Sequence, residues 1–277
     1  MELYIIILIV LETIVIFVLI GLLFFKASKL SGLSKEITNL KTYDKYLEDI
    51  QKQRDDFLAM LVHELRSPLS VIKGASDLML KEAHRLSKEQ IETLLAQVRN
   101  SSTGLLKIVN DILDISKLES GKFEITKEEN DLNVVLTDEC DYYKSLANEK
   151  QIEILTQLDV SLEKFKFDPD RVRQVMNNLL SNALKFSTEG GKVIVKSNKQ
   201  NERVFVSICD DGPGITDDMK HRIFHKFVQG GDNHTREKGT GLGLVISKGI
   251  VEAHGGSIWV EDNKPRGACF IFNIPLA

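Results

Sequence analysis

The chain contains few cysteines and no cluster of basic residues, and each of these absences excludes some classes of protein. Its 277 residues include three cysteines, Cys140, Cys209 and Cys269, which lie far apart in the sequence. They form no metal-ligand pair and no disulfide framework, so we expect Cys209 and Cys269, in apolar strand-like runs, to be small core residues in a reducing compartment. The formal net charge is -4. Without a clustered basic face, the chain is not expected to bind nucleic acid.

One long apolar run lies at the amino terminus. Residues 4–25 are apolar except for Glu12 and Thr13, and about 22 residues reach roughly 33 Å as a helix, enough to span a bilayer. A signal peptide fits less well, because no basic residue precedes the run and no small-residue cleavage site follows cleanly. Lysines follow the run. The charge bias therefore predicts a single-pass protein of the cell membrane, with the remaining domains in the cytoplasm.

After this run the pattern predicts a polar linker over residues 26–38 and then two long helices. Residues 26–53 are interpreted as linker and coiled coil, because apolar residues recur there and beyond at the spacing of a helix seam: Leu40, Tyr43, Leu47, Ile50, Phe57 and Leu61. A second stripe predicts a helix over residues 88–119 that Gly121 ends. These two helices are expected to form an antiparallel hairpin. Two such hairpins, one from each chain, are expected to pair into a dimeric, all-α four-helix bundle. A purely scaffolding coiled coil is the alternative interpretation.

His63 lies within FLAMLVHELRSPLS, residues 57–70, and is expected to point away from the helix seam. Its outward face also carries Ala59, Arg66, Ser67 and Ser70. All of these residues except Arg66 are small. Glu64 follows His63, and Pro68 perturbs the helix about one turn later. An imidazole exposed in this way can act as a nucleophile or general base near neutral pH. A lone surface histidine usually has no function, so the interpretation depends on the motifs that follow.

From about residue 122 the pattern changes to mixed α and β. The expected elements are a short strand at FEI (123–125), a helix over 131–149, a strand at IEILTQLD, a helix beginning after Asp168 with Pro169 in its first turn, a hairpin of KVIVKSNKQ and ERVFVSICD, and a second hairpin of GSIWVED and ACFIFNIPL. This order predicts an α+β sandwich, in which one sheet carries helices on one face.

Two glycine-containing motifs in this half suit a nucleotide. Asp210, Gly212 and Gly214 follow a hydrophobic strand as DDGPGI. A carboxylate there can accept the exocyclic amine of adenine, and the glycines let the backbone approach the ring. GTGLGL opens a predicted helix, where freed backbone N–H groups can hold phosphates; the residues concerned are Gly239, Thr240, Gly241, Leu242 and Gly243. Each motif alone also fits an ordinary turn or glycine-rich loop.

A polar helix face supplies the remaining candidate ligands. Asn178 and Asn182 are four residues apart on one face of the predicted helix, and Lys185 lies near them. The amide oxygen of Asn182 suits Mg²⁺, and Lys185 can neutralise phosphate charge. Phe224 and Phe227 are interpreted as core or hinge anchors, and the polar residues 229–238 as a lid over the nucleotide. For Asn178, Asn182 and Lys185, the alternative interpretation is an ordinary polar helix face without a ligand.

The order of these motifs resembles that of bacterial sensor histidine kinases. HELRSP, NNLLSNALKF, DDGPG, the two phenylalanines and GTGLGL occur in the family's order, and the resemblance covers about residues 40–277. It implies a dimerisation and phosphotransfer domain at 54–120 and a catalytic ATP-binding domain, with the fold shared by gyrase and MutL, at 122–277.

The resemblance also implies a reaction. His63 would accept the γ-phosphoryl group of ATP and pass it to an aspartate of a response regulator, mainly through positioning and charge neutralisation. Glu64 would take or orient the imidazole proton. Ser67 departs from the Thr or Asn that the family often has at this position, which puts phosphatase activity toward the regulator in question.

Two other functions use parts of the same pattern. An ATPase of the gyrase and MutL type would bind nucleotide in the same pocket, but it needs its own catalytic acid for water and has no use for an exposed histidine on a paired helix. A membrane-bound scaffold could bind nucleotide or a regulator without chemistry. The intact asparagines and glycines argue against it.

Overall fold

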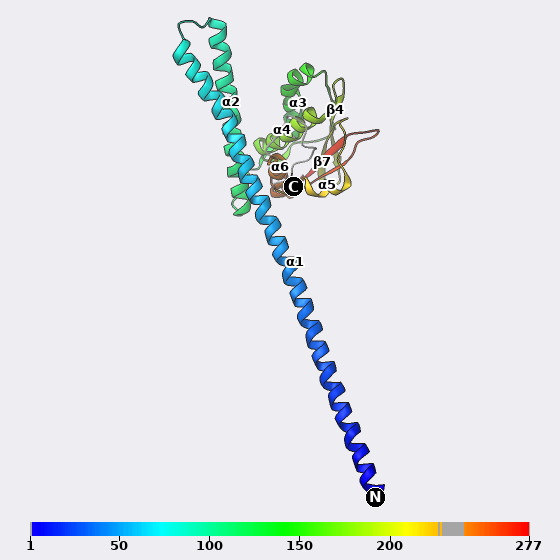
Figure 1. Cartoon of the computed structure of the whole chain (residues 1–277). Helices are drawn as coiled ribbons and strands as arrows, with labels where there is room; N and C mark the ends of the chain where they lie inside the picture. Colours follow the sequence, from blue (N-terminus) through cyan, green and yellow to red (C-terminus); the bar gives the residue numbers. More distant parts are fainter. Residues whose placement is uncertain (1, 227, 229–240, 277) are drawn as a thin grey trace. The chain divides into compact units, whose positions relative to one another are not determined.

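The computed structural model describes most of the chain in two units. Left out are residues 1, 227, 229–240 and 277, and the side chains of residues 2–15, 20, 27, 28 and 30–38. The compact units are Met1–Leu58 and Ala59–Ala277. Helix α1, Glu2–Glu82, begins in the first unit and ends in the second (Figure 1). Each unit is described by itself.

The first unit is helical throughout its described backbone. Residues 26–38 therefore belong to α1, so the predicted polar linker is part of a continuous helix. The segment KASKLSGLSKEIT contains one glycine and no proline, so nothing in it ends a helix.

The predicted membrane span over residues 4–25 is not confirmed. Within the described part of the chain, no helix combines the length and apolar character needed to cross a bilayer. The side chains of residues 4–15 lie outside that part. Apolar side chains that are described farther along the run are exposed, with Phe17 at 78% and Phe24 at 79%.

In the second unit, the end of α1 and helix α2, Lys88–Glu119, form the expected hairpin. The turn between them is fixed by a capping box. Ser87 Oγ accepts from Gln90 N at 3.2 Å, and Gln90 Oε1 accepts from Ser87 N at 2.8 Å, which satisfies two backbone donors at the start of α2. After α2, Gly121 has φ 66, a conformation that glycine adopts without strain. The predicted helical hairpin is confirmed.

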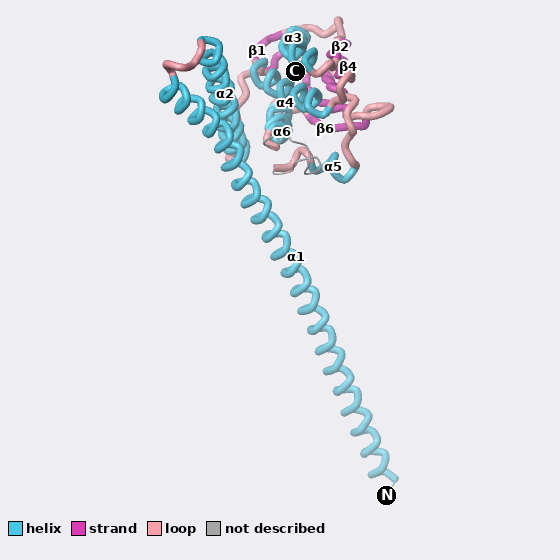
Figure 2. Tube along the Cα trace, turned by 45° about the horizontal axis from the view of Figure 1, so that its top comes forward, coloured by secondary structure: helices cyan, strands magenta, loops and turns pink. Residues whose placement is uncertain are grey.

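The carboxyl-terminal part is a layered α/β domain. Its five-stranded sheet has the order β2-β4-β5-β7-β6, with β2 parallel to β4 and the other neighbours antiparallel. The strands are β2 Glu153–Gln157, β4 Lys192–Gln200, β5 Arg203–Cys209, β6 Ser257–Asp262 and β7 Ala268–Pro275. Three helices lie on one face: α3 Leu132–Glu149, α4 Pro169–Phe186 and α6 Gly243–Ala253 (Figure 2). The predicted α+β arrangement with helices on one face is confirmed.

The core between sheet and helices follows from strand alternation. Val204, Val206 and Ile208 on β5 are fully buried, as are Leu179 and Leu180 on α4. Because side chains alternate along a strand, the residues between these on β5 face the opposite side of the sheet. Helix α5, Asp217–Arg222, lies after the DDGPG turn.

One predicted strand was wrong. FEI is not a strand; a small second sheet instead pairs β1, Glu128–Asn130, with β3, Phe165–Phe167. The β1 residues carry no apolar alternation, so only pairing with β3 defines them as a strand. Phe123 lies under the Arg171 guanidinium, 4.7 Å from its carbon to the ring centroid.

The cysteine prediction also needs correction. The β5–β7 register places Cys209 directly opposite Cys269, and a disulfide joins them. They are therefore not separate core thiols. Sixty residues separate them in the sequence, and only the antiparallel register brings them together. Cys140 is the free cysteine and is buried on α3.

Candidate nucleotide and phosphoacceptor site

His63 is exposed on α1, on the side of the helix away from the buried Leu61. Arg66 and Ser67 are also exposed, and Glu64 is half-buried. Among the described residues, none engages the His63 side chain in a hydrogen bond or ion pair. The imidazole is therefore accessible to a reactant.

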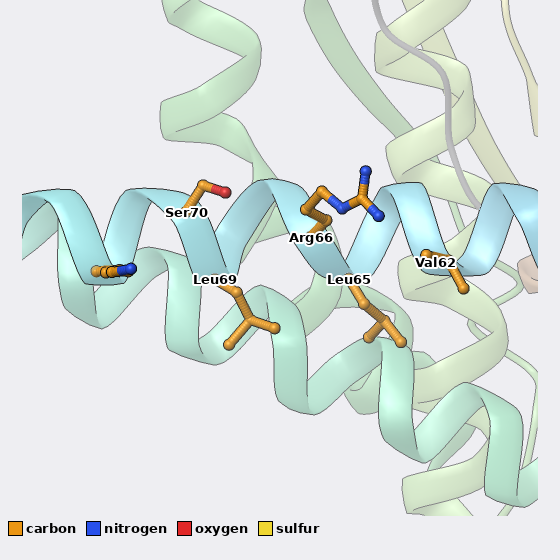
Figure 3. Close-up of a pocket in the computed structure, with 6 residues that line it drawn as sticks. Val62, Leu65, Arg66, Leu69 and Ser70 are labelled. Carbon is orange, nitrogen blue, oxygen red and sulfur yellow. The ribbon is translucent and has the colours of Figure 1, made fainter.

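An open groove runs along α1 next to His63. Its lining residues are Val62, Leu65, Arg66, Leu69, Ser70 and Lys73. Leu65 and Leu69 point toward the neighbouring helix, whereas Arg66 and Ser70 point away from it (Figure 3). The groove combines apolar side chains with two basic ones, and Val62 and Leu69 remain 54% and 50% exposed.

The start of α4 is held by Asp168. Its Oδ1 accepts from Arg171 N at 3.0 Å, and its Oδ2 accepts from Thr126 N at 2.8 Å. Pro169 takes the first helical position, where its missing N–H costs nothing. This cap fixes the orientation of the helix that carries both candidate asparagines.

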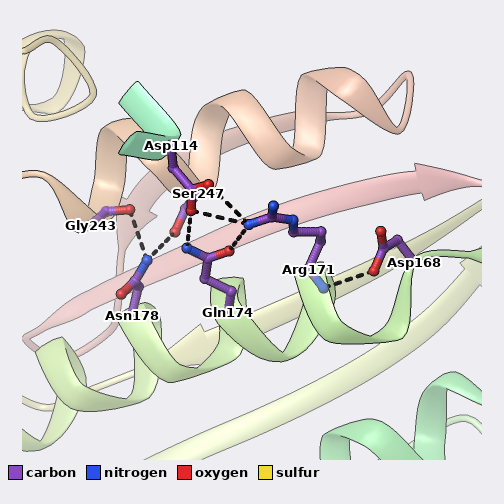
Figure 4. Close-up of polar contacts among 7 residues, drawn as sticks. All are labelled: Asp114, Asp168, Arg171, Gln174, Asn178, Gly243 and Ser247. Atoms are coloured by element: carbon purple, nitrogen blue, oxygen red, sulfur yellow. Dashed lines mark hydrogen bonds and ion pairs between the residues drawn. The ribbon is translucent and has the colours of Figure 1, made fainter. Parts of the chain in front are cut away.

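The two asparagines have different surroundings. Asn178 is buried, and its Nδ2 donates to Gly243 O at 3.1 Å and to Ser247 Oγ at 3.3 Å (Figure 4). These bonds join α4 to the start of α6. Asn182, one turn farther on, is half-buried, and its carboxamide makes no hydrogen bond within the described part of the chain. Asn178 therefore links α4 to α6, whereas the Asn182 carboxamide remains available to a ligand.

The start of α6 is closely packed against α4. Leu242 is fully buried, and Gly241 has φ 67. A Cβ on Gly243 would lie 3.1 Å from Asn178 Cγ, so glycine permits the close approach. Gly239 and Thr240 of the same motif, the proposed lid over 229–238 and Phe227 lie outside the described residues.

Asp210 is buried at the end of β5, 4% exposed. Its Oδ1 accepts from Gly212 N at 2.9 Å and from Ala268 N at 3.1 Å. Burial raises the pKa of this carboxyl, and the two backbone donors partly offset that effect. No described residue donates to Oδ2, so one carboxylate oxygen is held by the protein and the other is available.

The glycines after Asp210 are required by close contacts. A Cβ on Gly212 would lie 2.6 Å from Phe186 O, and Gly214 has φ 81. Both positions exclude ordinary side chains. The DDGPG segment therefore passes directly beside the end of α4.

Sequence reasoning missed the β6–β7 turn as part of this site. Asn263 Nδ2 donates to Asp210 O at 2.7 Å. Gly267 has φ 110, and a Cβ there would lie 1.9 Å from Asp210 O. The glycine and proline of NKPRG are typical of a turn, but only the sheet register places that turn against Asp210.

The described residues contain no group of three or more His, Cys, Asp and Glu side chains placed to hold a metal ion. A hard cation at this site would need oxygen ligands from an amide and from a bound phosphate. Mg²⁺ accepts such a set, because it usually retains waters and binds substrate phosphates. The available Asn182 amide fits this chemistry. Lys185 Nζ lies 5.3 Å from the centroid of the Phe186 ring.

A polar cluster connects α2 to α4. Arg171 Nη1 lies 3.1 Å and 3.2 Å from the two carboxylate oxygens of Asp114, and Gln174 Nε2 donates to Asp114 Oδ2 at 2.8 Å (Figure 4). The Asp114 side chain is 9% exposed. One turn earlier on α2, burial raises the pKa of Asp111 to about 6, with Lys107 lowering it and Asp114 raising it further.

Two family models match the chain. The model described as "His Kinase A (phospho-acceptor) domain" matches residues 53–121. The model described as "Histidine kinase-, DNA gyrase B-, and HSP90-like ATPase" matches residues 167–277. Together they cover more than half of the chain and include His63 and the Asp210 site.

Curated relatives are similar over most of this chain. "Adaptive-response sensory kinase SasA" of Crocosphaera subtropica is 31% identical over 90% of this chain and 66% of its own length. "Sensor histidine kinase AruS" of Pseudomonas aeruginosa is 39% identical over 83% of this chain and 23% of its own length. The chain thus spans less than two thirds of the length of these relatives.

Solved structures of histidine kinases are also similar to this chain. Full-length ShkA in complex with AMPPNP has a TM-score of 0.61 and 33% identity, covering 79% of this chain and 45% of that one. The catalytic domain of histidine kinase ThkA has a TM-score of 0.50 and 31% identity, covering 55% of this chain and 97% of that one. ThkA in complex with response regulator protein TrrA has a TM-score of 0.59 and 28% identity, covering 83% and 66%.

The fold and the site define a phosphoacceptor helical hairpin joined to an ATPase-type α/β domain. With the two family models and these relatives, the chain belongs to the bacterial two-component sensor histidine kinases.

Proposed function

We propose that this protein transfers the γ-phosphoryl group of ATP to His63 and then to an aspartate of a response regulator. The observation that carries the proposal is an exposed, unengaged imidazole at His63 in the same chain as the Asp210 site. One imidazole nitrogen forms a bond to the γ-phosphorus as the bond to the bridging oxygen of ADP breaks. The imidazole proton passes to Glu64 or to solvent. A carboxylate oxygen of the regulator then takes the phosphoryl group and restores the imidazole.

We infer that ATP binds between α4, the DDGPG turn and the start of α6. Asp210 Oδ2 would accept the exocyclic amine of adenine, with Gly212 and Gly214 beside the ring. Backbone N–H groups would hold the phosphates, from Gly239, Thr240, Gly241, Leu242 and Gly243. Asn182 would ligate Mg²⁺, which neutralises phosphate charge when bound, and Lys185 would assist. The AMPPNP complex of ShkA supports a nucleotide at such a site.

We infer that the partner of the second step is a receiver domain. ThkA, which resembles this chain in structure, forms a complex with a response regulator protein. Ser67, four residues after His63 and exposed, lies about one helical turn away, where its hydroxyl can orient a water. If Ser67→Ala removes phosphate from the regulator as fast as wild type does, Ser67 has no phosphatase role.

We further propose a homodimer built on the phosphotransfer hairpin at 54–120, with the ATP-binding domain at 122–277. The coiled-coil seam within 26–53 supports pairing: Leu40 and Tyr43 are 57% and 59% exposed in the single chain. On α2, Leu106 and Leu113 are 63% and 53% exposed. A partner hairpin would bury these side chains.

We also propose that residues 4–25 attach the chain to the cell membrane as one helix, with the kinase domains on the cytoplasmic side. The support is the apolar sequence and the lysines that follow it. Flotation of the full chain with lipid vesicles, against a chain lacking residues 1–29, tests this. Equal recovery of both chains in the unbound fraction would refute the anchor.

The kinase proposal is tested by a substitution that removes the side-chain amide of Asn182. Asn182→Ala should reduce autophosphorylation by about 100-fold or more, as loss of a well-placed electrostatic contact does, with the magnesium dependence weakened. Asn177→Ala is the matched control, because its carboxamide donates to Arg173 O on the same helix. Equal labelling of Asn182→Ala and wild type would overturn the assigned role.

A further inference from the structure

The disulfide between Cys209 and Cys269 lies directly beside the carboxylate proposed to read adenine. Cys209 precedes Asp210, and Cys269 follows Ala268. Asp210 N donates to Ala268 O at 2.8 Å, and Ala268 N donates to Asp210 Oδ1 at 3.1 Å. The disulfide and these two hydrogen bonds therefore lie next to each other, and both connect the end of β5 to the start of β7.

The disulfide lies on the face of the sheet that the three helices do not cover. Ile208 and Phe270, each next to a cysteine, are buried under the helices. Because side chains alternate along strands, Cys209 and Cys269 point to the opposite face of the sheet from α3, α4 and α6. Cys209 is 8% exposed and Cys269 is half-buried, so Cys269 is the more exposed residue and the one we expect a small thiol to attack.

Opening the disulfide would act on the Asp210 carboxylate. Directly opposite residues in an antiparallel pair hold their side chains close together, and two unbonded sulfur atoms need more space than a bonded pair. The sulfur atoms would move apart through rotation of the side chains and through a shift of the strand ends, and such a shift would carry Asp210 and Ala268 with it. The two donors that hold Oδ1, Gly212 N and Ala268 N, would then no longer be fixed together.

We propose that Cys209 and Cys269 form a thiol–disulfide switch that sets the affinity of the neighbouring nucleotide site, a regulation that rests on the ATP-binding function proposed above. The closed, oxidised pair preorganises Asp210 for adenine. The open, reduced pair binds nucleotide more weakly. The chemical partners are low-molecular-weight thiols and disulfides.

The exchange is a two-electron reaction. A thiolate of a dithiol attacks Cys269 Sγ, the S–S bond breaks, and Cys209 leaves as a thiolate that takes up a proton. The second thiol of the reductant resolves the mixed disulfide. The cysteine pair gains two electrons and two protons, and the dithiol becomes a disulfide. Oxidised glutathione runs the reaction in the other direction and leaves as two molecules of glutathione.

The test compares the full chain after treatment with oxidised glutathione and after treatment with dithiothreitol, each reagent then being removed. Denatured oxidised protein should show one titratable thiol, Cys140, and reduced protein all three. Digestion without reductant should yield a peptide that links Cys209 to Cys269. AMPPNP with Mg²⁺, followed by calorimetry, should bind the reduced form about fivefold more weakly, the low end of couplings between linked sites.

Two variants complete the experiment. Cys140→Ser should keep the fivefold difference, because this thiol is buried on α3 away from the pair. Cys269→Ser should bind AMPPNP equally after either treatment. The comparison of the two wild-type forms does not depend on how well either variant folds.

Three results would count against the switch. No linked peptide after oxidation would overturn it, and so would equal AMPPNP affinity of the two wild-type forms, in both cases with the kinase proposal intact. Failure of both wild-type forms to bind AMPPNP would overturn the proposed function and this inference with it.

Discussion

His254 shows at the scale of one residue how a buried side chain supports the start of α4. It is 1% exposed. Its Nε2 accepts from Asp168 N at 3.0 Å, while Nδ1 lies 2.8 Å from Ile250 O and donates to it. This pattern requires the neutral ring with the proton on Nδ1. A proton added to Nε2 would face the Asp168 N–H.

The pH dependence of stability follows from this environment. Burial lowers the pKa of His254 below 6.5, with Lys127 lowering it further and the Ile250 carbonyl and Asp168 opposing. The unfolded chain therefore takes up the proton first as pH falls. The contribution of His254 is complete above about pH 6.5 and is lost as pH falls below it.

His254→Gln should flatten that dependence. Between pH 7 and pH 5, wild type should lose free energy of unfolding more steeply than the variant, by at most about 1.4 kcal/mol per pH unit. Urea unfolding followed through the fluorescence of Trp259, the one tryptophan, measures both slopes. Parallel slopes would contradict the neutral, buried His254.

Asn178 shows what sequence spacing can and cannot establish about a site residue. The four-residue spacing correctly put Asn178 and Asn182 on one helix, and it made both of them candidate nucleotide-binding residues, with Asn182 as the Mg²⁺ ligand. The structure instead engages Asn178 Nδ2 with Gly243 O and Ser247 Oγ. That difference depends on how α4 packs against α6, which no local pattern encodes.

At the scale of elements, the sequence was most informative where a local rule acts. Helix α4 begins where Asp168 and Pro169 predicted it, and the strands with clear alternation, β4 and β5, form the expected hairpin. Strand β1 and the Cys209–Cys269 pair were missed because both are defined by partners distant in the chain. Pairing and register are long-range properties.

The contact between α2 and α4 gives a prediction at this scale. Arg171→Ala should cost about 1.5–3 kcal/mol in free energy of unfolding, because it removes a charged partner from the buried Asp114 carboxylate. In a double-mutant cycle, Asp114→Ala should remove most of this cost. The measurement is urea unfolding followed through Trp259 fluorescence.

The control for that cycle is an exposed ion pair. Arg222 and Asp218 on α5 are 54% and 78% exposed, so Arg222→Ala should cost about 0.5 kcal/mol or less. If Arg171→Ala costs no more than Arg222→Ala, the α2–α4 ion pair does not stabilise the protein.

At the scale of the whole molecule, the exposed apolar side chains of the hairpin predict a dimer. A fragment of residues 30–277 should scatter light with twice its monomer mass at micromolar concentration. Leu69→Glu, in the groove beside His63, should weaken dimerisation by about tenfold or more, because a carboxylate would be buried unpaired. Val160→Glu, at a residue 98% exposed, is the control and should change nothing. A monomeric wild-type fragment would contradict the proposed bundle.

The central claim is that phosphate from ATP reaches His63. Incubation of the protein with γ-labelled ATP and Mg²⁺ should give a label that is stable in base and lost in acid, as expected for a phosphorylated imidazole. His63→Gln should abolish the label, whereas His84→Gln, at an exposed histidine in the turn between α1 and α2, should retain it. Label that persists in His63→Gln, or that is absent from wild type, would contradict the account.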